Sequence, residues 1–315
     1  MKILANDGIA PSGKTALEAQ NFEVLTDKVE QNDLIQHIKA ENIEVLLVRS
    51  ATKVREDLID ACPNLKMIGR GGVGMDNIDV AYARKKGIEV FNTPAASSQS
   101  VAELVMAHLF GAVRYLYDSN RQMPERGESE FKILKKQYAQ GIELRGKTLG
   151  IIGFGRIGKA VATYALGCGL EVIVHDRNQG PFEINVKVGN QIARVQLEND
   201  GLEEVLEKSD FISLHVPAVD EAILGKKEIE SMKDGSIIIN TSRGGTVDEN
   251  ALLEALDRGK IAHAALDVFE GEPQPKREIL NHSKISLSPH IGAATQEAQD
   301  RIGVELAENI IDFLG

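Results

Sequence analysis

The chain is poor in the residues that stabilise small secreted proteins or that line membranes. Its 315 residues include two cysteines, Cys62 and Cys168, no tryptophan and 4% aromatic residues. Two cysteines provide neither a disulfide framework nor the ligand spacing of a metal site, and both fit the role of small buried apolar side chains. No apolar run approaches the roughly 18 residues of a membrane span, and the first residues lack the apolar core of a signal peptide. A cytoplasmic protein without a metal site is therefore expected.

Positive charge is also scarce, because 36 lysines and arginines stand against 47 aspartates and glutamates, for a net charge of −11. This balance argues against a general nucleic-acid-binding surface, and nothing in the sequence indicates membrane binding. A small anionic ligand would need local cations, so arginines at the ends of strands are candidates for binding it. What the chain does have is length enough for two domains and the 43% hydrophobic content of an ordinary globular protein.

Short apolar runs alternate with helical patterns along most of the chain, which predicts an α/β fold with mainly parallel sheets. The strands predicted in the first part are residues 2–4, 45–48, 66–69 and 88–92, with a helix at 33–38 among them. The strands predicted in the second part are residues 147–152, 171–175, 211–215, 236–242, 264–269 and 285–288. A final helix with one apolar stripe is predicted for residues 294–314.

Between the two series, a long helix is predicted from Ser100, where Ser100 and Glu103 form a capping-box pattern, to about Tyr117. The polar stretch that follows, residues 118–140, gives no clear structural signal. Residues 184–195, which contain a two-residue Gly-Asn turn between alternating segments, are typical of a β-hairpin.

A glycine-rich segment, Gly-Phe-Gly-Arg-Ile-Gly, lies between a predicted strand and a predicted helix. Gly153 would permit the tight turn, Gly155 the close approach of a pyrophosphate, and Gly158 close packing of helix on strand. The free N–H groups of the helix N-terminus would bind the phosphates. The residues expected to form this cofactor site are Gly153, Phe154, Gly155, Arg156, Ile157 and Gly158. A glycine-rich turn without a ligand is the alternative.

The next predicted strand ends in Asp176, which lies 18 residues after Gly158. A carboxylate near this spacing can bind the ribose 2′-OH and would repel a 2′-phosphate. NAD is therefore expected as the cofactor, although the adjacent Arg177 keeps NADP open. In the alternative without a ligand, Asp176 would only cap the element that follows.

Three reactive side chains, Arg243, Glu272 and His290, each lie just past a strand-like run. Ligands collect at the carboxyl ends of the strands in an open parallel sheet. An imidazole suits proton transfer near neutrality, a neighbouring carboxylate would stabilise its charged form and fix its tautomer, and a guanidinium pairs bidentately with a carboxylate. Spacing alone leaves other assignments open, because His215 also ends a strand, Glu272 could be a turn carboxylate and Arg243 a surface cation.

Longer motifs around these residues resemble those of the D-isomer-specific 2-hydroxyacid dehydrogenases. They are residues 240–248 (NTSRGGTVD), 267–273 (DVFEGEP) and 288–295 (SPHIGAAT), and with the glycine loop they follow the family's order over nearly the whole chain. The resemblance implies that Arg243 binds the substrate carboxylate, that His290 is the acid/base and that Glu272 pairs with it. The further residues expected to bind the cofactor are His215, Pro217, Thr241 and Asp267.

The resemblance also implies the architecture: two doubly wound parallel-sheet domains, with a Rossmann NAD-binding domain inserted into a flavodoxin-like substrate-binding domain. The inserted domain is expected to comprise residues 98–287, and the substrate-binding domain residues 1–97 and 288–315. The active site would lie in the cleft between the domains, with hinges near Ala96 and Pro289. The helix from Ser100 and the polar stretch after it would build a homodimer.

Two segments, residues 47–54 and 68–79, resemble the phosphoglycerate dehydrogenase branch of the family in particular. A phosphorylated hydroxy acid carries about three negative charges, which Arg49 and Arg70 could neutralise together with Arg243, unless both are solvated surface residues. Backbone N–H groups of residues 72–74, within the second segment, could hold a carboxylate as a nest. The residues expected to bind substrate are Arg49, Ser50, Arg70, Gly72, Val73 and Gly74.

The expected activity is thus the NAD-dependent oxidation of D-3-phosphoglycerate to 3-phosphohydroxypyruvate, which begins serine synthesis. Because the sequence ends at residue 315, the C-terminal serine-sensing domain of longer relatives is not expected. A hydroxypyruvate or glyoxylate reductase, or another D-2-hydroxyacid dehydrogenase, is the alternative within the family. A non-catalytic NAD sensor of the corepressor type, which keeps the same three residues, is the alternative outside enzymology.

Overall fold

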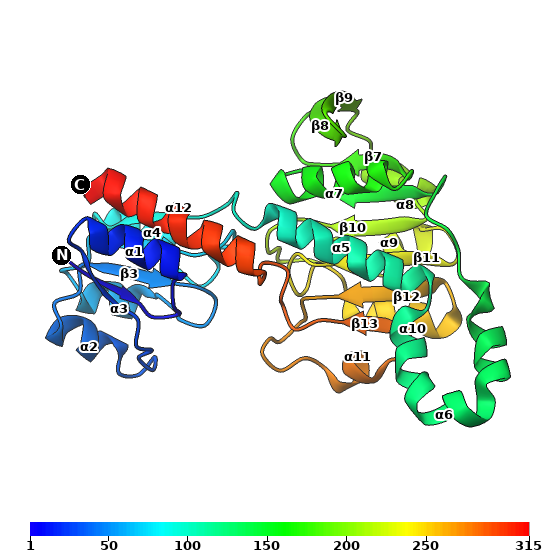
Figure 1. Ribbon diagram of the computed structural model, residues 1–315, viewed down its shortest axis with the longest axis horizontal. Coiled ribbons are helices and arrows are strands. Elements are labelled where there is room, and N and C mark those ends of the chain that lie inside the picture. Colours follow the sequence, from blue (N-terminus) through cyan, green and yellow to red (C-terminus); the bar gives the residue numbers. More distant parts are fainter. Residues whose placement is uncertain (315) are drawn as a thin grey trace. The chain divides into compact units, whose positions relative to one another are not determined.

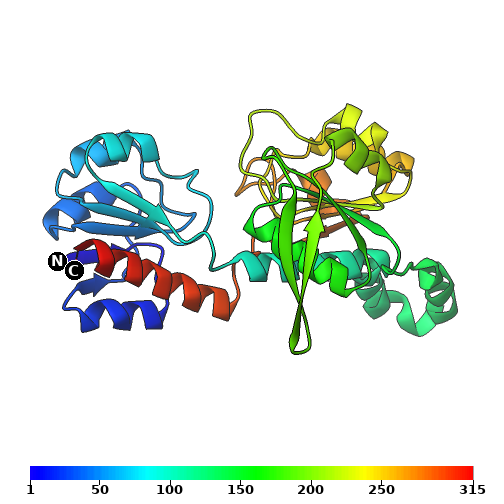
Figure 2. The same ribbon diagram turned by 90° about the horizontal axis from the view of Figure 1, so that it is seen from above.

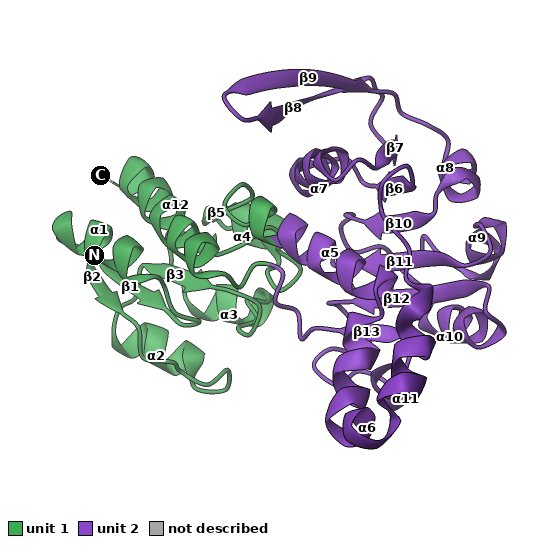
Figure 3. Cartoon of the chain, turned by 45° about the vertical axis from the view of Figure 1, so that its right-hand side comes forward, with its two compact units in different colours: residues 1–100, 293–315 green, residues 101–292 purple. Residues whose placement is uncertain are grey.

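The computed structural model describes residues 1–314, whose helices and strands are labelled in Figure 1. The chain divides into two compact units (Figure 3), one formed by residues 1–100 with the segment that starts at residue 293, the other by residues 101–292. These boundaries lie three and five residues beyond residues 97 and 287. Within residues 1–314, no helix combines the length and the apolar character needed to cross a membrane.

The first unit is built on a five-stranded parallel sheet with the order β2-β1-β3-β4-β5, which is the flavodoxin-like order. Its strands are β1 (Lys2–Ala5), β2 (Glu23–Leu25), β3 (Val45–Val48), β4 (Met67–Arg70) and β5 (Glu89–Asn92). Its helices are α1 (Pro11–Ala19), α2 (Leu34–Ala40), α3 (Glu56–Ala61), α4 (Val80–Lys85) and α12 (Gln296–Leu314).

Alternation along the strands gives this sheet two apolar faces. Ile3 of β1 packs into a core with α1 and α12, whereas Leu4 packs into the opposite core with α2 and α3. Helices α1 and α12 lie side by side (Figures 1 and 2). A Cβ atom on Gly13 would lie 2.3 Å from the carbonyl oxygen of Gly303, so the two helices meet backbone to backbone.

The second unit is built on a six-stranded parallel sheet with the order β13-β12-β11-β10-β6-β7. Its strands are β6 (Thr148–Ile152), β7 (Glu171–His175), β10 (Phe211–Leu214), β11 (Ser236–Asn240), β12 (Ile261–Leu266) and β13 (Ile285–Leu287). An isolated parallel bridge between Val174 and Asn199 takes the place of the Rossmann third strand beside β7. The strand order therefore reverses between β6 and β10, where Rossmann domains bind dinucleotides. The doubly wound α/β fold is confirmed in both units.

The helices of the second unit cover both faces of this sheet. They are α5 (Ser98–Val113), α6 (Leu116–Gln137), α7 (Arg156–Gly167), α8 (Leu202–Lys208), α9 (Lys226–Ser231), α10 (Glu249–Arg258) and α11 (Arg277–Asn281), with a short 3₁₀ turn at Tyr138–Gln140. The central strands β10 and β11 are buried along their whole length, which explains their continuous apolar sequences.

The predicted end of the helix from Ser100 was wrong, because α5 begins at Ser98 and ends at Val113, not Tyr117. The polar stretch, for which no structure was predicted, lies mostly in the helix α6. The chain turns at Tyr115, which has a left-handed φ of 53° and whose ring packs edge-on against His263 at 5.1 Å. This tertiary contact has no signature in the local sequence. Helix α6 is hard to predict because it is mostly polar and contains Pro124.

The predicted hairpin is confirmed and is longer than expected. Strands β8 (Phe182–Val188) and β9 (Gln191–Leu197) pair in antiparallel register, with Val188 opposite Gln191. Gly189 of the two-residue turn has a φ of 59°, which glycine adopts without strain. The buried side of β8 packs against α7, and the Phe182 ring lies 5.1 Å from that of Phe154 in the glycine loop.

Candidate active site

The glycine loop lies at the point where the strand order of the second unit reverses. Gly153 follows β6 with a φ of 91°, and a Cβ there would lie 2.4 Å from the carbonyl oxygen of His215. A Cβ on Gly158 would lie 2.3 Å from the carbonyl oxygen of Gly153, so helix α7 can start this close to the strand only with glycine. Gly155 faces open space, since a Cβ there would meet nothing within 4 Å. The loop thus leaves room for a ligand at its middle glycine.

Asp176, at the end of β7, closes over this loop. Its Oδ2 accepts a hydrogen bond of 2.6 Å from the Phe154 N–H, and its Oδ1 accepts from the backbone and side chain of Asn178. Partial burial alone would raise the pKa of Asp176, but the hydrogen bonds from Asn178 and Phe154 outweigh it and lower the pKa. The carboxylate stays charged, which suits ribose hydroxyls and opposes a 2′-phosphate.

Two buried polar atoms near the loop have no hydrogen-bond partner among residues 1–314: Nδ1 of His215 and Oγ1 of Thr241. Part of His215 is exposed, but its imidazole is shielded from water, and this desolvation lowers its pKa to about 3. Its Nε2 lies 2.9 Å from the Ser213 hydroxyl, so the neutral ring is held in one orientation. Buried polar atoms are nearly always satisfied, so these two fit contacts with a dinucleotide. Pro217, also expected here, is exposed.

The loop that carries Arg243 is fixed by Asn240 at the end of β11. The Asn240 amide donates to the carbonyl oxygen of Arg243 at 3.1 Å and to the hydroxyl of Thr246 at 3.0 Å, and its oxygen accepts from the backbone and hydroxyl of Ser242. Asn240 is 2% exposed. These bonds replace the sheet ladder where the strand ends and so set the direction in which the arginine leaves the sheet.

The arginine loop touches the loop that carries Glu272. A Cβ on Gly244 would lie 1.9 Å from the carbonyl oxygen of Phe269, so only glycine permits this approach. The backbone N–H of Glu270 donates to Glu249, a carboxylate 3% exposed at the start of α10. Burial raises the pKa of Glu249. The roles of Asn240, Gly244 and Glu249 were missed from the sequence alone. In sequence they look like ordinary residues at the end of a strand, in a loop and at the start of a helix.

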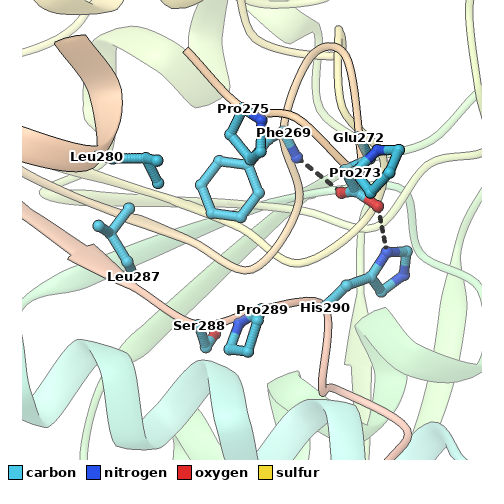
Figure 4. Close-up of a pocket in the computed structure, with 9 residues that line it drawn as sticks. All are labelled: Phe269, Glu272, Pro273, Pro275, Leu280, Leu287, Ser288, Pro289 and His290. Atoms are coloured by element: carbon cyan, nitrogen blue, oxygen red, sulfur yellow. Dashed lines mark hydrogen bonds and ion pairs between the residues drawn. The ribbon is translucent and has the colours of Figure 1, made fainter. Parts of the chain in front are cut away.

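Glu272 and His290 form a hydrogen-bonded pair (Figure 4). Nδ1 of His290 lies 2.8 Å from Oε2 of Glu272, whose Oε1 accepts the Phe269 N–H at 2.9 Å. Burial alone would raise the pKa of Glu272, but the bond from His290, the Phe269 N–H and the charge of Arg243 lower it. The carboxylate is therefore ionised and fixes the proton of a neutral imidazole on Nδ1, which leaves Nε2 as the free base. Arg243, Glu272 and His290 are thus brought together in the second unit.

A cavity of about 380 Å³ adjoins this pair, with largely apolar walls. Its lining residues, drawn in Figure 4, are Phe269, Glu272, Pro273, Pro275, Leu280, Leu287, Ser288, Pro289 and His290.

The backbone of His290 is strained, with a left-handed φ of 55°. Its N–H donates to the carbonyl oxygen of Asp267 at 2.8 Å. The Asp267 carboxylate, 1% exposed, accepts the Ser288 hydroxyl at 2.6 Å and the N–H groups of Ile291 and Gly292 at 2.9 Å. Asp267, expected to bind the cofactor, therefore holds both sides of the histidine loop, and strain of this kind persists only where such contacts enforce it.

The residues expected to bind substrate lie in the first unit. Arg49 follows β3 and lines a cavity of about 280 Å³ with Asp7 and Gly71. Its backbone is fixed, because its N–H donates to Asp7 at 2.7 Å and its carbonyl oxygen accepts from Asn77 at 2.8 Å. Ser50 is exposed beside it.

The proposed carboxylate nest after β4 is incomplete. The N–H of Gly72 donates to the hydroxyl of Thr93 at 2.7 Å and is not available, which leaves Val73 and Gly74. Gly72 has a φ of 135°, and a Cβ there would collide with the guanidinium of Arg70. Gly72 therefore makes room for that side chain, whose Nη1 donates to the carbonyl oxygen of Gly71 at 3.1 Å.

Comparison with known proteins agrees with this geometry. The family described as D-isomer specific 2-hydroxyacid dehydrogenase, NAD binding domain, matches residues 106–292. A hydroxypyruvate reductase from Thermotoga maritima is 44% identical over 304 residues, which cover 95% of this chain and 93% of that protein. A D-3-phosphoglycerate dehydrogenase from Methanocaldococcus jannaschii is 42% identical over 312 residues; they cover 98% of this chain and 57% of that protein, so the chain spans little more than half its length.

Among solved structures, the TT0316 protein from Thermus thermophilus superposes with a TM-score of 0.86 at 29% identity, covering 99% of this chain and 96% of that one. The chain therefore belongs to the D-isomer-specific 2-hydroxyacid dehydrogenases. Its second unit contains the NAD-binding domain of that family.

The hydrogen bond between Glu272 and His290 predicts distinct effects for two substitutions. His290→Ala removes the base and should lower kcat about 10²- to 10⁴-fold while NAD still binds. Glu272→Gln should lower kcat about tenfold and shift the pH–rate profile, because an amide does not interact with the imidazole as the ionised carboxylate does. Absorbance of NADH between pH 5.5 and 10 measures both. An unshifted profile in Glu272→Gln would show that the pair does not act in catalysis.

Proposed function

We propose that the chain oxidises D-3-phosphoglycerate to 3-phosphohydroxypyruvate with NAD, the reaction that begins serine synthesis. The observation that carries the reaction type is the hydrogen bond of 2.8 Å between Nδ1 of His290 and Glu272, beside Arg243. Membership of the family makes the chain an NAD-dependent oxidoreductase for D-2-hydroxy acids. The choice of phosphoglycerate is supported by the arginines of the first unit.

Each residue has a defined task in this proposal. Arg243 binds the substrate carboxylate and orients C2. Nε2 of His290 accepts the proton of the C2 hydroxyl, and the ionised Glu272 stabilises the imidazolium that results. Bound NAD supplies the acceptor for the hydride that leaves C2. In the reverse direction, the imidazolium of His290 returns its proton to the carbonyl oxygen.

The distal phosphate is assigned to Arg49 and Arg70. A chain with a net charge of −11 repels a trianionic substrate at long range, so binding depends on cations placed at the site. Arg49 lies at the carboxyl end of β3, next to the position where the strand order of the first unit reverses, and lines a cavity there. Both arginines occupy the sheet edge at which open parallel sheets bind ligands.

A hydroxypyruvate reductase is the second candidate. The relative of that name from Thermotoga maritima matches over 93% of its own length, whereas the phosphoglycerate dehydrogenases match over about 57% or less. Hydroxypyruvate lacks a phosphate, so a reductase would not need both arginines. The proton transfer through His290 would be the same.

A panel of 2-hydroxy and 2-oxo acids, assayed with NAD and with NADP, tests the proposal. We expect the highest kcat/KM for D-3-phosphoglycerate among the hydroxy acids and a preference for NAD. Turnover of glycerate, hydroxypyruvate or glyoxylate without turnover of the phosphorylated acid would establish the reductase instead. No turnover of any acid, with NAD bound, would favour the non-catalytic sensor.

The assignment of the arginines predicts a substrate-dependent defect. Arg49→Glu and Arg70→Glu should each lower kcat/KM for D-3-phosphoglycerate by about 10- to 100-fold, the loss of one charge-assisted hydrogen bond, and spare glyoxylate. Lys39→Glu, an exposed lysine of α2 in the same unit, makes the same charge change and should have little effect. Equal losses for phosphorylated and unphosphorylated acids would remove the arginines from phosphate binding.

We also propose that the chain forms a homodimer through α5, α6 and the segment after them. Large apolar side chains are exposed along this part of the second unit: Phe110, Leu116, Met123, Phe131, Ile133 and Ile142. Single exposed apolar residues are common, but a group within 33 consecutive residues is typical of an interaction surface.

Substitution of Phe131 and Ile133, which are 56% and 58% exposed, tests this surface. The double variant Phe131→Asp, Ile133→Asp should shift the mass measured by light scattering from twice 34.3 kDa to 34.3 kDa. The matched control is Val188→Asp, Ile192→Asp in the exposed end of the hairpin, which should stay dimeric. A wild-type protein that is already monomeric would refute the dimer.

A further inference from the structure

His108 is a buried histidine of α5 that the reaction described above does not use. It is 7% exposed and lies among the apolar residues of a helix that packs under β12 and β13. Its Nδ1 lies 3.0 Å from the Ser286 hydroxyl and its Nε2 lies 2.9 Å from the Ser288 hydroxyl. Both nitrogens are therefore directed to the strand and loop that lead to His290.

One tautomer of the neutral imidazole satisfies the hydrogen bonds around His108. The Ser288 hydroxyl donates to Asp267 at 2.6 Å, so its oxygen is left to accept a bond from His108. This requires the proton on Nε2, and Nδ1 then accepts from the Ser286 hydroxyl. Burial lowers the pKa of His108, which keeps the ring neutral at neutral pH.

The Asp267 carboxylate connects this network to the catalytic loop. Through its two oxygens it holds the N–H groups of Ile291 and Gly292, on the far side of His290 from Ser288. A misdirected Ser288 hydroxyl would leave one carboxylate oxygen short of a buried partner and would loosen the loop at its start. Within the loop, His290 has the strained, left-handed backbone, so a loosened loop would release strain chiefly at this residue.

The position of α5 also matches this role. A Cβ on Gly292 would lie 3.3 Å from the side chain of Val101, so the first turn of α5 packs against the end of the loop while His108 reaches its start. One helix thus supports both ends of residues 288–292, and His108 makes a polar contact with the first of them.

We propose that His108 is a positioning residue: it orients the Ser288 hydroxyl toward Asp267 and so holds the His290 imidazole in register with Glu272. The proposal rests on the role of His290 as the acid/base of the proposed function. His108 touches neither substrate nor cofactor in it, and acts only through the loop.

Two substitutions of His108 and one control separate positioning from general stability. His108→Leu removes both hydrogen bonds and should lower kcat about 10- to 100-fold, the effect of a small misplacement of a catalytic group, with the Kd for NAD unchanged. His108→Gln keeps a donor that can reach Ser288 and should recover most of kcat. His263→Leu, another largely buried histidine of the same unit, packs on Tyr115 and should keep wild-type kcat.

Ser288→Ala removes the hydroxyl that joins His108 to Asp267 and leaves the sequence of α5 unchanged. It should reproduce the loss of His108→Leu, and the double variant should lose no more than either single variant, because both break one path. Additive losses would show that the two residues act separately. Should His108→Leu fail to fold, Ser288→Ala and His108→Gln still decide the matter by their kcat values.

A readout without turnover separates this proposal from the proposed function. In proton NMR, the Nδ1–H of His290 bonded to Glu272 should give a downfield resonance, identified by its loss in His290→Ala. This signal should vanish or shift in His108→Leu and Ser288→Ala, and persist in His108→Gln and His263→Leu. Wild-type kcat and an unchanged signal in both His108→Leu and Ser288→Ala would overturn the positioning role. A wild-type protein that turns over no 2-hydroxy acid would refute the proposed function instead, while the NMR comparison would still test the loop.

Discussion

The position of His290 depends on one buried carboxylate. Asp267 directly follows β12, the strand between β11 and β13, and binds the loop that follows β13 from both sides of the histidine. A carboxyl group with so little exposure is stable only because three donors satisfy it. These hydrogen bonds hold His290 in a backbone conformation that a non-glycine residue rarely adopts. The pair with Glu272 follows from that arrangement, since the imidazole then meets a second loop fixed by Glu249 and by the close approach at Gly244.

Much of this could be predicted from the sequence because the signals are local. Strands β10 and β11 are short apolar runs. In the glycine loop between β6 and α7, the spacing of Gly153, Gly155 and Gly158 alone indicates the turn, the ligand approach and the close helix packing. The carboxyl ends of parallel strands meet at one edge, so reactive residues just past them could be grouped without coordinates.

The contacts that fix the site could not be predicted because they join residues far apart in the chain. His108 meets Ser286 and Ser288 across 178 and 180 residues, and in sequence it is one polar residue in an apolar helix. Glu249 reaches Glu270 across 21 residues. Gly72 was expected to offer its N–H to a carboxylate, but Thr93 from a neighbouring segment takes it. Tyr115, between α5 and α6, packs its ring on His263 far along the chain, a contact that no local propensity reflects.

The catalytic residues and the substrate-binding residues answer to different constraints. A hydroxypyruvate reductase at 44% identity and a phosphoglycerate dehydrogenase at 42% show that close relatives of this chain carry names for different acids. In the proposed function, the proton transfer is assigned to a pair of side chains in the second unit and the distal charge of the substrate to side chains of the first. Arg49 shows how its loop is fixed in the first unit: its backbone N–H donates to the carboxylate of Asp7 at 2.7 Å, and the Asp7 side chain is only 5% exposed.

The backbone contact between α1 and α12 bears on how the protein is made. Ile302, Leu306 and Ile310 of α12 complete the core that Ile3 and Leu47 begin, yet the ribosome adds them after the whole second unit. Until then one face of the sheet β2-β1-β3-β4-β5 has no cover over much of its apolar surface. The second unit is continuous in sequence and can fold first, while the nascent first unit carries an exposed sheet face that is prone to association. Chaperone dependence during synthesis should therefore arise from the first unit, although it is the part of the chain that emerges earliest.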